Sequence, residues 1–206
     1  MTGVQTCALP IFGCSGLELT ADERAFFRDT DPLGFIVFAR NIDSPDQARK
    51  LIDDLRVCVA RADAPVLVDQ EGGRVARLKP PHWRKAPPGR VLGELYRRDP
   101  AKGLEAARLN SRLLAHDVAS IGCDVDCLPV LDIAFPETHA VIGDRAYADT
   151  AEAVAAIGER AKQAAVAAGA DPARVAVVDV EETPLTYITE PAARIRVKAA
   201  GPLASG

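Results

Sequence analysis

Short apolar runs alternate with amphipathic stretches along most of the chain. Residues 34–38, 66–68 and 124–128 have the length of buried strands, and each is bounded by turn or polar residues. Between and after them, apolar residues recur at helical spacing, most clearly from Pro45 and from Pro100. Because strands that alternate with helices form parallel βαβ units, the pattern predicts an α/β fold.

The predicted helices have recognisable ends and apolar faces. Ser44 is a good N-cap, and Pro45 suits the first helical position. The apolar face of this helix comprises Ala48, Leu51, Ile52 and Leu55. A second helix is predicted from Pro100 to about Gly122. Its inner face is expected to comprise Leu104, Ala107, Leu109, Leu113, Leu114 and Val118. A third helix is predicted over residues 150–168.

The composition is that of an ordinary globular protein. The 206 residues are 48% hydrophobic and 26% charged, with a formal net charge of −4. This charge gives no support for binding to nucleic acid or to an anionic membrane. No apolar run approaches the roughly 18 residues needed to span a bilayer. We therefore expect neither a nucleic-acid partner nor a membrane partner.

Five cysteines are present, of which Cys7 lies in an unusual N-terminal segment. The other four, Cys14, Cys58, Cys123 and Cys127, lack the spacing of a zinc site. We expect buried free thiols in a reducing compartment, with neither a bound metal nor disulfides.

The densest group of chemically active residues is VDQEGGRVARL, residues 68–78. Asp69 and Glu71 follow a predicted strand, two glycines permit a tight turn, and Arg74 and Arg77 come next. Ligands bind at the carboxyl ends of parallel strands. Asp and Gly also simply end strands, but two acids and two arginines exceed what a turn needs. The segment therefore predicts a ligand site.

This segment, with LGFIVFARNI at 33–42, LPVLDI at 128–133 and VIGDR at 141–145, closely resembles bacterial β-N-acetylhexosaminidases of glycoside hydrolase family 3. The resemblance runs from about Phe12 to about Ile157. It implies the incomplete N-terminal half of a (β/α)8 TIM barrel. It also implies a cytoplasmic enzyme without a cofactor that removes terminal N-acetylglucosamine from muropeptides in cell-wall recycling. A family 3 β-glucosidase is an alternative, which the short start and the IGDR motif disfavour.

Both ends of the chain depart from this family. Residues 1–11, MTGVQTCALPI, resemble a translated sequencing adapter. A lipoprotein signal is the alternative, but no Lys or Arg precedes Arg24. After about residue 165 the sequence resembles a segment of the hydantoinase/oxoprolinase family A-type subunits. We expect an artefactual leader at 1–11, a partial TIM-barrel glycosidase domain at 12–160 and an unrelated chimeric tail at 161–206. A divergent family 3 sequence is the alternative for the tail.

A glycosidase needs two groups that flank the scissile bond. By residue type alone, Asp69, Glu71 and Asp132 could be nominated. In the family the nucleophile lies in a Ser-Asp-Asp segment and the acid/base histidine on a loop after Lys-His-x-Pro-Gly-His-Gly, and this sequence contains neither. We therefore expect no catalytic residue in this chain and no turnover. Asp132 is expected at the barrel rim.

The resemblance assigns sugar-holding roles to three residues. Asp69 would accept hydrogen bonds from sugar hydroxyls, while Arg77 and Arg145 would position the glycan. A carboxylate can accept two hydroxyl bonds, and a guanidinium offers a rigid fork of donors. The alternative is an internal Asp–Arg ion pair that holds the rim together. Glu71 and Arg74 are expected to brace the turn.

The histidines match none of the family's catalytic positions. His82 and Trp83 lie in a loop at 80–88 that contains four prolines. They could line an aglycone subsite, or they could pack over the barrel rim. His116 on a helix and His139 in a loop are given no role.

Overall fold

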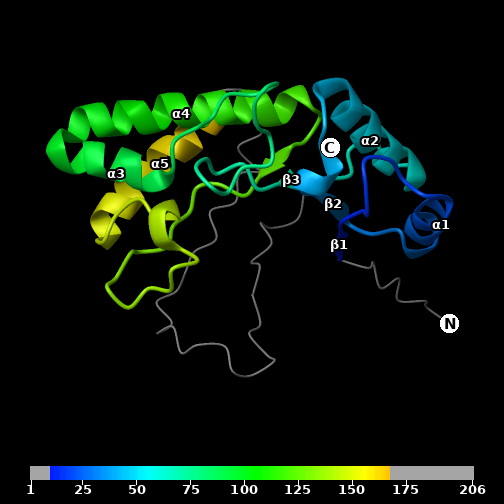
Figure 1. The fold of residues 1–206 in the computed structure, drawn as a ribbon, viewed down its shortest axis with the longest axis horizontal. Helices are drawn as coiled ribbons and strands as arrows, with labels where there is room; N and C mark the ends of the chain where they lie inside the picture. Colours follow the sequence, from blue (N-terminus) through cyan, green and yellow to red (C-terminus); the bar gives the residue numbers. More distant parts are fainter. Residues whose placement is uncertain (1–9, 168–206) are drawn as a thin grey trace, which may run out of the picture. The chain divides into compact units, whose positions relative to one another are not determined.

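The computed structural model describes residues 10–167. Within them, a parallel sheet has the order β1-β2-β3-β4 (Figure 1). The strands are β1 Ile11–Phe12, β2 Gly34–Val37, β3 Val66–Val68 and β4 Val125–Asp126. Each strand pairs in parallel with the next one along the chain. Sequential parallel pairing without a change of direction is the arrangement of a barrel, as predicted.

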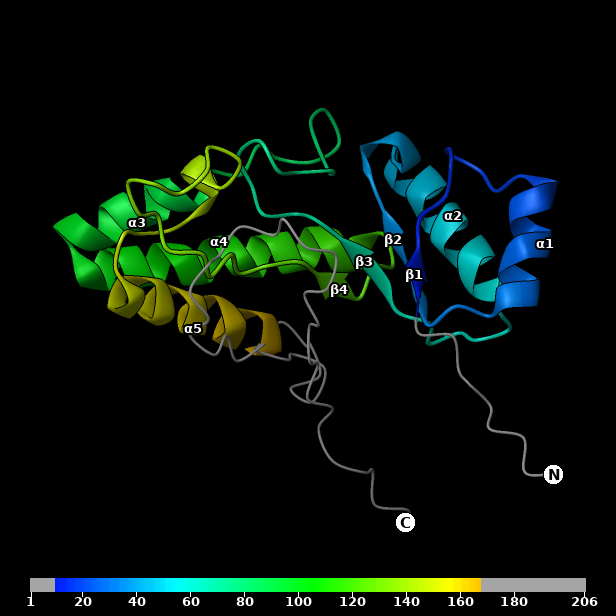
Figure 2. The ribbon, with the colours of Figure 1, turned by 90° about the horizontal axis from the view of Figure 1, so that it is seen from below.

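Helices connect and follow these strands (Figure 2). They are α1 Ala21–Thr30, α2 Pro45–Cys58, α3 Gly89–Arg98, α4 Pro100–Ser120 and α5 Ala151–Ala167, with short 3-10 turns η1 Ala39–Asn41 and η2 Gly143–Arg145. Helix α1 packs against α2, and α3 and α5 both pack against α4. None of the helices within residues 10–167 is long and apolar enough to cross a bilayer.

Helix α2 begins where the sequence predicts. The Ser44 hydroxyl accepts a hydrogen bond from the Gln47 amide at 3.4 Å, and Pro45 occupies the first turn. All four residues of its predicted apolar face are buried. They pack behind the sheet in one core cluster with Phe35, Val37, Val66 and Val68. Local capping and apolar spacing were sufficient to predict this element.

Helices α1 and α3 were not predicted. Helix α1 has a capping box in which Thr20 and Glu23 bond reciprocally, but Phe27 is its one buried residue. Helix α3 begins directly after the proline-rich loop, with no side-chain hydrogen bond at its N-cap, Pro88. Helix α3 does have apolar Leu92, Leu95 and Tyr96 at helical spacing, a pattern that was present in the sequence but not used.

The predicted inner face of α4 was partly wrong. Ala107, Leu114 and Val118 are buried, but Leu109 is 45% exposed and Leu113 is 50% exposed. The buried positions on α4 recur every three or four residues and include the polar Asn110 and Ser111. Leu109 and Leu113 lie outside that stripe, because successive helical residues are about 100° apart.

The described sheet begins one residue earlier than the predicted domain start at residue 12. Ile11 pairs with Gly34, and the Leu33 amide donates to the Pro10 carbonyl at 3.1 Å. Residues 161–167 of the predicted tail continue helix α5. The rest of that tail, and residues 1–9 of the predicted leader, lie outside the described residues.

Candidate functional site

The carboxyl end of β3 leads directly into the predicted site. Asp69 follows the strand, and the amides of Glu71 and Gly72 both donate to the Val75 carbonyl, which closes a tight turn. Gly72 and Gly73 have φ values of 100° and 58°. A Cβ added to Gly72 would lie 2.3 Å from the Pro87 carbonyl oxygen. The Gly pair is therefore required by both backbone conformation and space.

Gln70 organises this turn from behind. Its side chain is buried, and its Oε1 accepts from the backbone amides of Arg77 at 2.8 Å and Leu78 at 2.9 Å. Its Nε2 donates to the Leu78 carbonyl at 3.1 Å. Gln70 was not among the residues predicted to form the site. Its position between two acids, on the opposite side of an extended backbone, was the signal that it faces inward.

Asp69 and Arg77 form an ion pair at the front of the turn. Arg77 Nη2 lies 2.7 Å from Asp69 Oδ2, and the two side chains are 22% and 24% exposed. The guanidinium also lies 5.9 Å from the centre of the Phe38 ring, within reach of a cation–π contact. The structure thus contains the Asp–Arg pair that was weighed as the alternative to a ligand role. Both side chains remain accessible at the surface.

Arg145 is held by Glu71. Its Nε and Nη2 each lie 2.8 Å from one oxygen of the Glu71 carboxylate, so the pair is bidentate. The Glu71 side chain is 7% exposed and that of Arg145 is 23% exposed. The pKa of Arg145 is raised mainly by its hydrogen bond to Glu71. Arg145 therefore stays charged and has a fixed orientation beside Asp69's turn.

A second ion pair joins the same two loops. Arg74 Nε lies 2.8 Å from Asp144 Oδ1, and Arg74 Nη2 also donates to the carbonyl oxygens of Ala140, Val141 and Ile142. Glu71 and Arg74 were expected to brace the turn. In the structure both contact the VIGDR loop, because Glu71 pairs with Arg145 and Arg74 pairs with Asp144.

Asp126, the last residue of β4, is a partly exposed acid with one enclosed carboxylate oxygen, and it was not selected from the sequence. Its Oδ1 accepts from the Gln70 amide at 3.0 Å, and its Oδ2 is enclosed without a hydrogen-bond partner among the described residues. Burial raises its pKa to about 8, and the negative charges of Glu71 and Asp69 act in the same direction. The hydrogen bond from Gln70 lowers the pKa but does not outweigh them. An acid inside a predicted strand was the available signal.

The cysteines differ from expectation at one position. Cys14, Cys58 and Cys123 are buried and free, but Cys127 is free and exposed. Cys127 follows β4 at the rim, where the sheet ends. Burial of its sulfur and a bond to Asp69 raise the pKa of Cys127 to about 12, so it is a neutral thiol at neutral pH.

Five further residues were considered from the sequence, namely Trp83, His82, His116, His139 and Asp132. Trp83 is buried in the main core cluster, so it packs neither in an exposed subsite nor over the barrel rim as the alternative supposed. His82 is exposed beside it, and His116 is exposed on α4. His139 Nδ1 accepts from the Val141 amide at 3.1 Å, and Asp132 is exposed after β4. Within residues 10–167, no group of three or more His, Cys, Asp or Glu is arranged to hold a metal ion.

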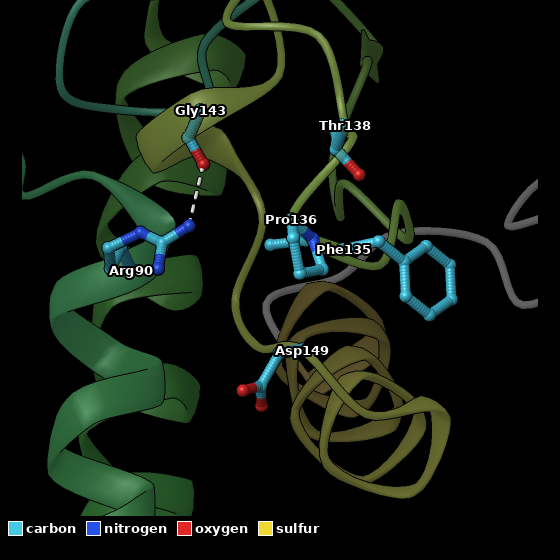
Figure 3. A pocket seen from close by; sticks show the side chains of 7 residues that line it. Arg90, Phe135, Pro136, Thr138, Gly143 and Asp149 are labelled. Carbon is cyan, nitrogen blue, oxygen red and sulfur yellow. Dashed lines mark hydrogen bonds between the residues drawn. The ribbon is translucent and has the colours of Figure 1, made fainter.

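A shallow hollow of about 290 Å³ lies beyond the VIGDR loop (Figure 3). It is lined by Arg90, Ala134, Phe135, Pro136, Thr138, Gly143 and Asp149. Arg90 Nη2 donates to the Gly143 carbonyl at 3.0 Å and so joins α3 to η2. None of the three residues predicted to bind the sugar lines this hollow.

Comparison with known sequences matches residues 14–183 to the glycosyl hydrolase family 3 N terminal domain. A β-hexosaminidase of Xanthomonas campestris pv. campestris strain B100 is 36% identical over 159 residues, which cover 77% of this chain and 47% of the relative. A β-hexosaminidase of Alkalilimnicola ehrlichii is 37% identical over 144 residues, covering 70% and 40% respectively. The chain spans about half the length of the curated relatives it matches.

Solved structures agree with this result. NagZ from Neisseria gonorrhoeae in complex with N-trifluoroacetyl-D-glucosamine matches with a TM-score of 0.72 and 28% identity, over 79% of this chain and 47% of that one. A glycoside hydrolase family 3 β-N-acetylglucosaminidase from Paenibacillus sp. str. FPU-7 matches with a TM-score of 0.67 and 31% identity, over 77% and 30%. With the sheet order above, the predicted N-terminal barrel half is confirmed.

Proposed function

Because this chain belongs to glycosyl hydrolase family 3, we propose that its carboxyl-end site holds the terminal N-acetylglucosamine of a glycan. The observation that carries the proposal is the placement of Asp69. It lies directly after β3 and is 24% exposed at its side chain, and Arg77 fixes one of its oxygens. A carboxylate held in this way is ready to accept hydrogen bonds from sugar hydroxyls.

The two arginines complete the sugar-holding group. Arg77 orients Asp69 and presents the remaining donors of its guanidinium at the same edge. Arg145 is kept in place by the bidentate bond to Glu71 and contributes a second fixed cation. Charged donors and acceptors that are already positioned lose little freedom when a polar ligand binds. Asp69, Arg77 and Arg145 are therefore assigned to substrate binding.

The wider activity follows from the relatives. The matched curated proteins are β-hexosaminidases, and the neighbouring structures include NagZ and β-N-acetylglucosaminidases. We assign the same reaction to the protein from which this sequence derives, namely hydrolysis of terminal N-acetylglucosamine from muropeptides in cytoplasmic cell-wall recycling. The family's nucleophile and acid/base segments do not occur in this sequence. The chain as it stands should bind the sugar without cleaving it.

The test is sugar binding and turnover by the full chain. N-acetylglucosamine should bind weakly in NMR titrations, and Asp69→Ala should lower the affinity by about tenfold, as expected for a lost charged hydrogen bond. An aryl N-acetyl-β-glucosaminide should not be turned over, because catalytic groups that act as a unit are missing.

Asp53→Ala is the matched control, because Asp53 is exposed on α2. Unchanged affinity in Asp69→Ala would contradict the site. Turnover that survives purification and disappears in Asp69→Ala would contradict the proposed inactivity. Tighter binding of glucose than of N-acetylglucosamine would instead favour a β-glucosidase.

A further inference from the structure

Asp126 lies directly behind the candidate sugar site. It is paired with Val68 in the β3–β4 register, and Val68 is fully buried. Because side chains alternate along a strand, Asp69 faces the opposite side of the sheet from Val68 and Asp126. Asp126 therefore does not reach a sugar held by Asp69. It touches the backbone that carries Asp69.

The surroundings of Asp126 are unsuited to a negative charge. Its Oδ2 is enclosed and meets no hydrogen-bond partner in the described part of the chain. Asp126 takes part in none of the ion pairs formed by residues 10–167, whereas Arg77 and Arg145 are bonded to Asp69 and Glu71. Enclosing a carboxylate oxygen without a hydrogen-bond partner or counter-charge disfavours the ionised form, so such a group tends to take up a proton.

We propose that Asp126 carries a proton at neutral pH and in that neutral form positions the turn that bears Asp69. Its Oδ1 holds the Gln70 amide at 3.0 Å. The Gln70 side chain in turn holds the amides of Arg77 and Leu78, and Arg77 holds Asp69. Loss of the proton adds a third negative charge beside Asp69 and Glu71, and we expect this repulsion to displace the turn even though the hydrogen bond from the Gln70 amide favours the ionised form. The consequence for sugar binding rests on the proposed function.

The other titratable groups around Asp126 do not compete for this role. Burial raises the pKa of Cys123 and of Cys127 to about 12, and burial also raises the pKa of Tyr147. These three groups are neutral at pH 7. Asp69 and Glu71 lie in the turn after β3, and the negative charge of each raises the pKa of Asp126. Asp126 is thus the group in this cluster that changes charge just above neutral pH.

Thermodynamic linkage fixes the sign of the stability effect. The pKa of Asp126 is raised from 3.8 to about 8 in the folded protein, so between these values the folded state binds the extra proton. Its contribution to stability is therefore present at low pH, falls as the pH rises through this window and is lost above about 8. Asp126→Asn keeps the shape and the Oδ1 acceptor but removes the titration.

The experiment compares the full wild-type chain with Asp126→Asn, and with Asp53→Asn as an exposed control. The Cγ resonance of Asp126, followed in aspartate-labelled protein, should titrate with a midpoint of about 8. The amide resonances of Gln70, Arg77 and Leu78 should move with the same midpoint, and should stop moving in Asp126→Asn.

The thermal midpoint provides a second readout. Asp126→Asn should gain at least about 5 °C relative to wild type between about pH 5 and pH 8.5, whereas Asp53→Asn should track wild type. The inference is overturned if every aspartate of the wild type titrates below about pH 5. It is also overturned if the amide resonances of Gln70, Arg77 and Leu78 titrate in Asp126→Asn as they do in the wild type. If that variant does not fold, the wild-type resonances alone decide between these outcomes.

Sugar binding separates this inference from the proposed function. N-acetylglucosamine affinity of the wild type should weaken by about fivefold across the same midpoint, a typical coupling between two sites, and should stay flat in Asp126→Asn. Absence of sugar binding at every pH, with the Asp126 and amide titrations intact, contradicts the proposed function and supports the positioning role. If Asp126 titrates with a midpoint of about 8 but the affinity for N-acetylglucosamine does not change across that midpoint, the positioning role is overturned.

Discussion

Two ion pairs at the same edge of the sheet differ in how they are built. Asp69 and Arg77 are eight residues apart within one loop and share one hydrogen bond of 2.7 Å. Glu71 and Arg145 are 74 residues apart and share two bonds of 2.8 Å. The first pair orients a side chain that faces solvent. The second joins the loop after β3 to the loop after β4.

Burial separates the two pairs further. The Asp69 side chain is 24% exposed, while that of Glu71 is 7% exposed. A partly exposed ion pair contributes little to stability, because water can solvate either charged side chain when the pair is broken. A buried carboxylate depends on its partner, since breaking the pair leaves an uncompensated charge. One pair is thus suited to meeting a ligand and the other to holding the site together.

Breaking the inter-loop pair should have the largest effect on stability. Glu71→Ala should lower the free energy of unfolding by about 2–4 kcal/mol, because Arg145 loses both bonds and the loop loses its anchor. Asp69→Ala is the comparison and should cost about 1 kcal/mol or less. Urea unfolding followed by circular dichroism measures both. Equal costs for the two variants would show that burial does not distinguish the pairs.

Replacing each arginine by lysine should sharpen the comparison. Lysine keeps the charge but cannot form the bidentate fork. We expect Arg145→Lys to cost about 1–2 kcal/mol and Arg77→Lys about 0.5 kcal/mol, because only the former loses a second hydrogen bond. The same unfolding measurement applies, and a larger cost for Arg77→Lys would reverse the assignment of the two roles.

The exposed pair between the same loops should matter least. Arg74 and Asp144 are 45% and 41% exposed at their side chains. Asp144→Ala should cost about 0.5 kcal/mol or less, and this cost should shrink at high salt because exposed charges are screened. Unfolding at low and high ionic strength measures it. A loss comparable with that of Glu71→Ala would mean that the loops are held mainly through Arg74.

Much of the fold could be predicted because it is determined locally. Helix α2 has its cap, its proline and its apolar spacing within one short segment, and all were correctly interpreted. The predicted strand at 66–68 was correct, whereas those at 34–38 and 124–128 proved shorter, at Gly34–Val37 and Val125–Asp126. Helix α1 was missed because a single buried residue, Phe27, gives no apolar period.

The candidate site was predicted in part for the same reason. The acids, glycines and arginines of residues 68–78 form their turn from neighbouring residues, so a strand-end site could be inferred. Trp83 shows the limit, because a loop tryptophan has the same local sequence whether it faces a ligand or fills the core. The structure places it in the core.

The sequence by itself determined the alternation of strands and helices, the glycine turn after β3 and the family resemblance. It also supplied the charges of Asp69 and Arg77 in one loop. Only the tertiary structure decided that Glu71 bonds to Arg145 and that Asp126 is enclosed behind the turn. The physical reason is that local propensities act between neighbours along the chain. The distances between remote segments arise only when the chain is packed, and so does the burial that shifts the pKa of a side chain.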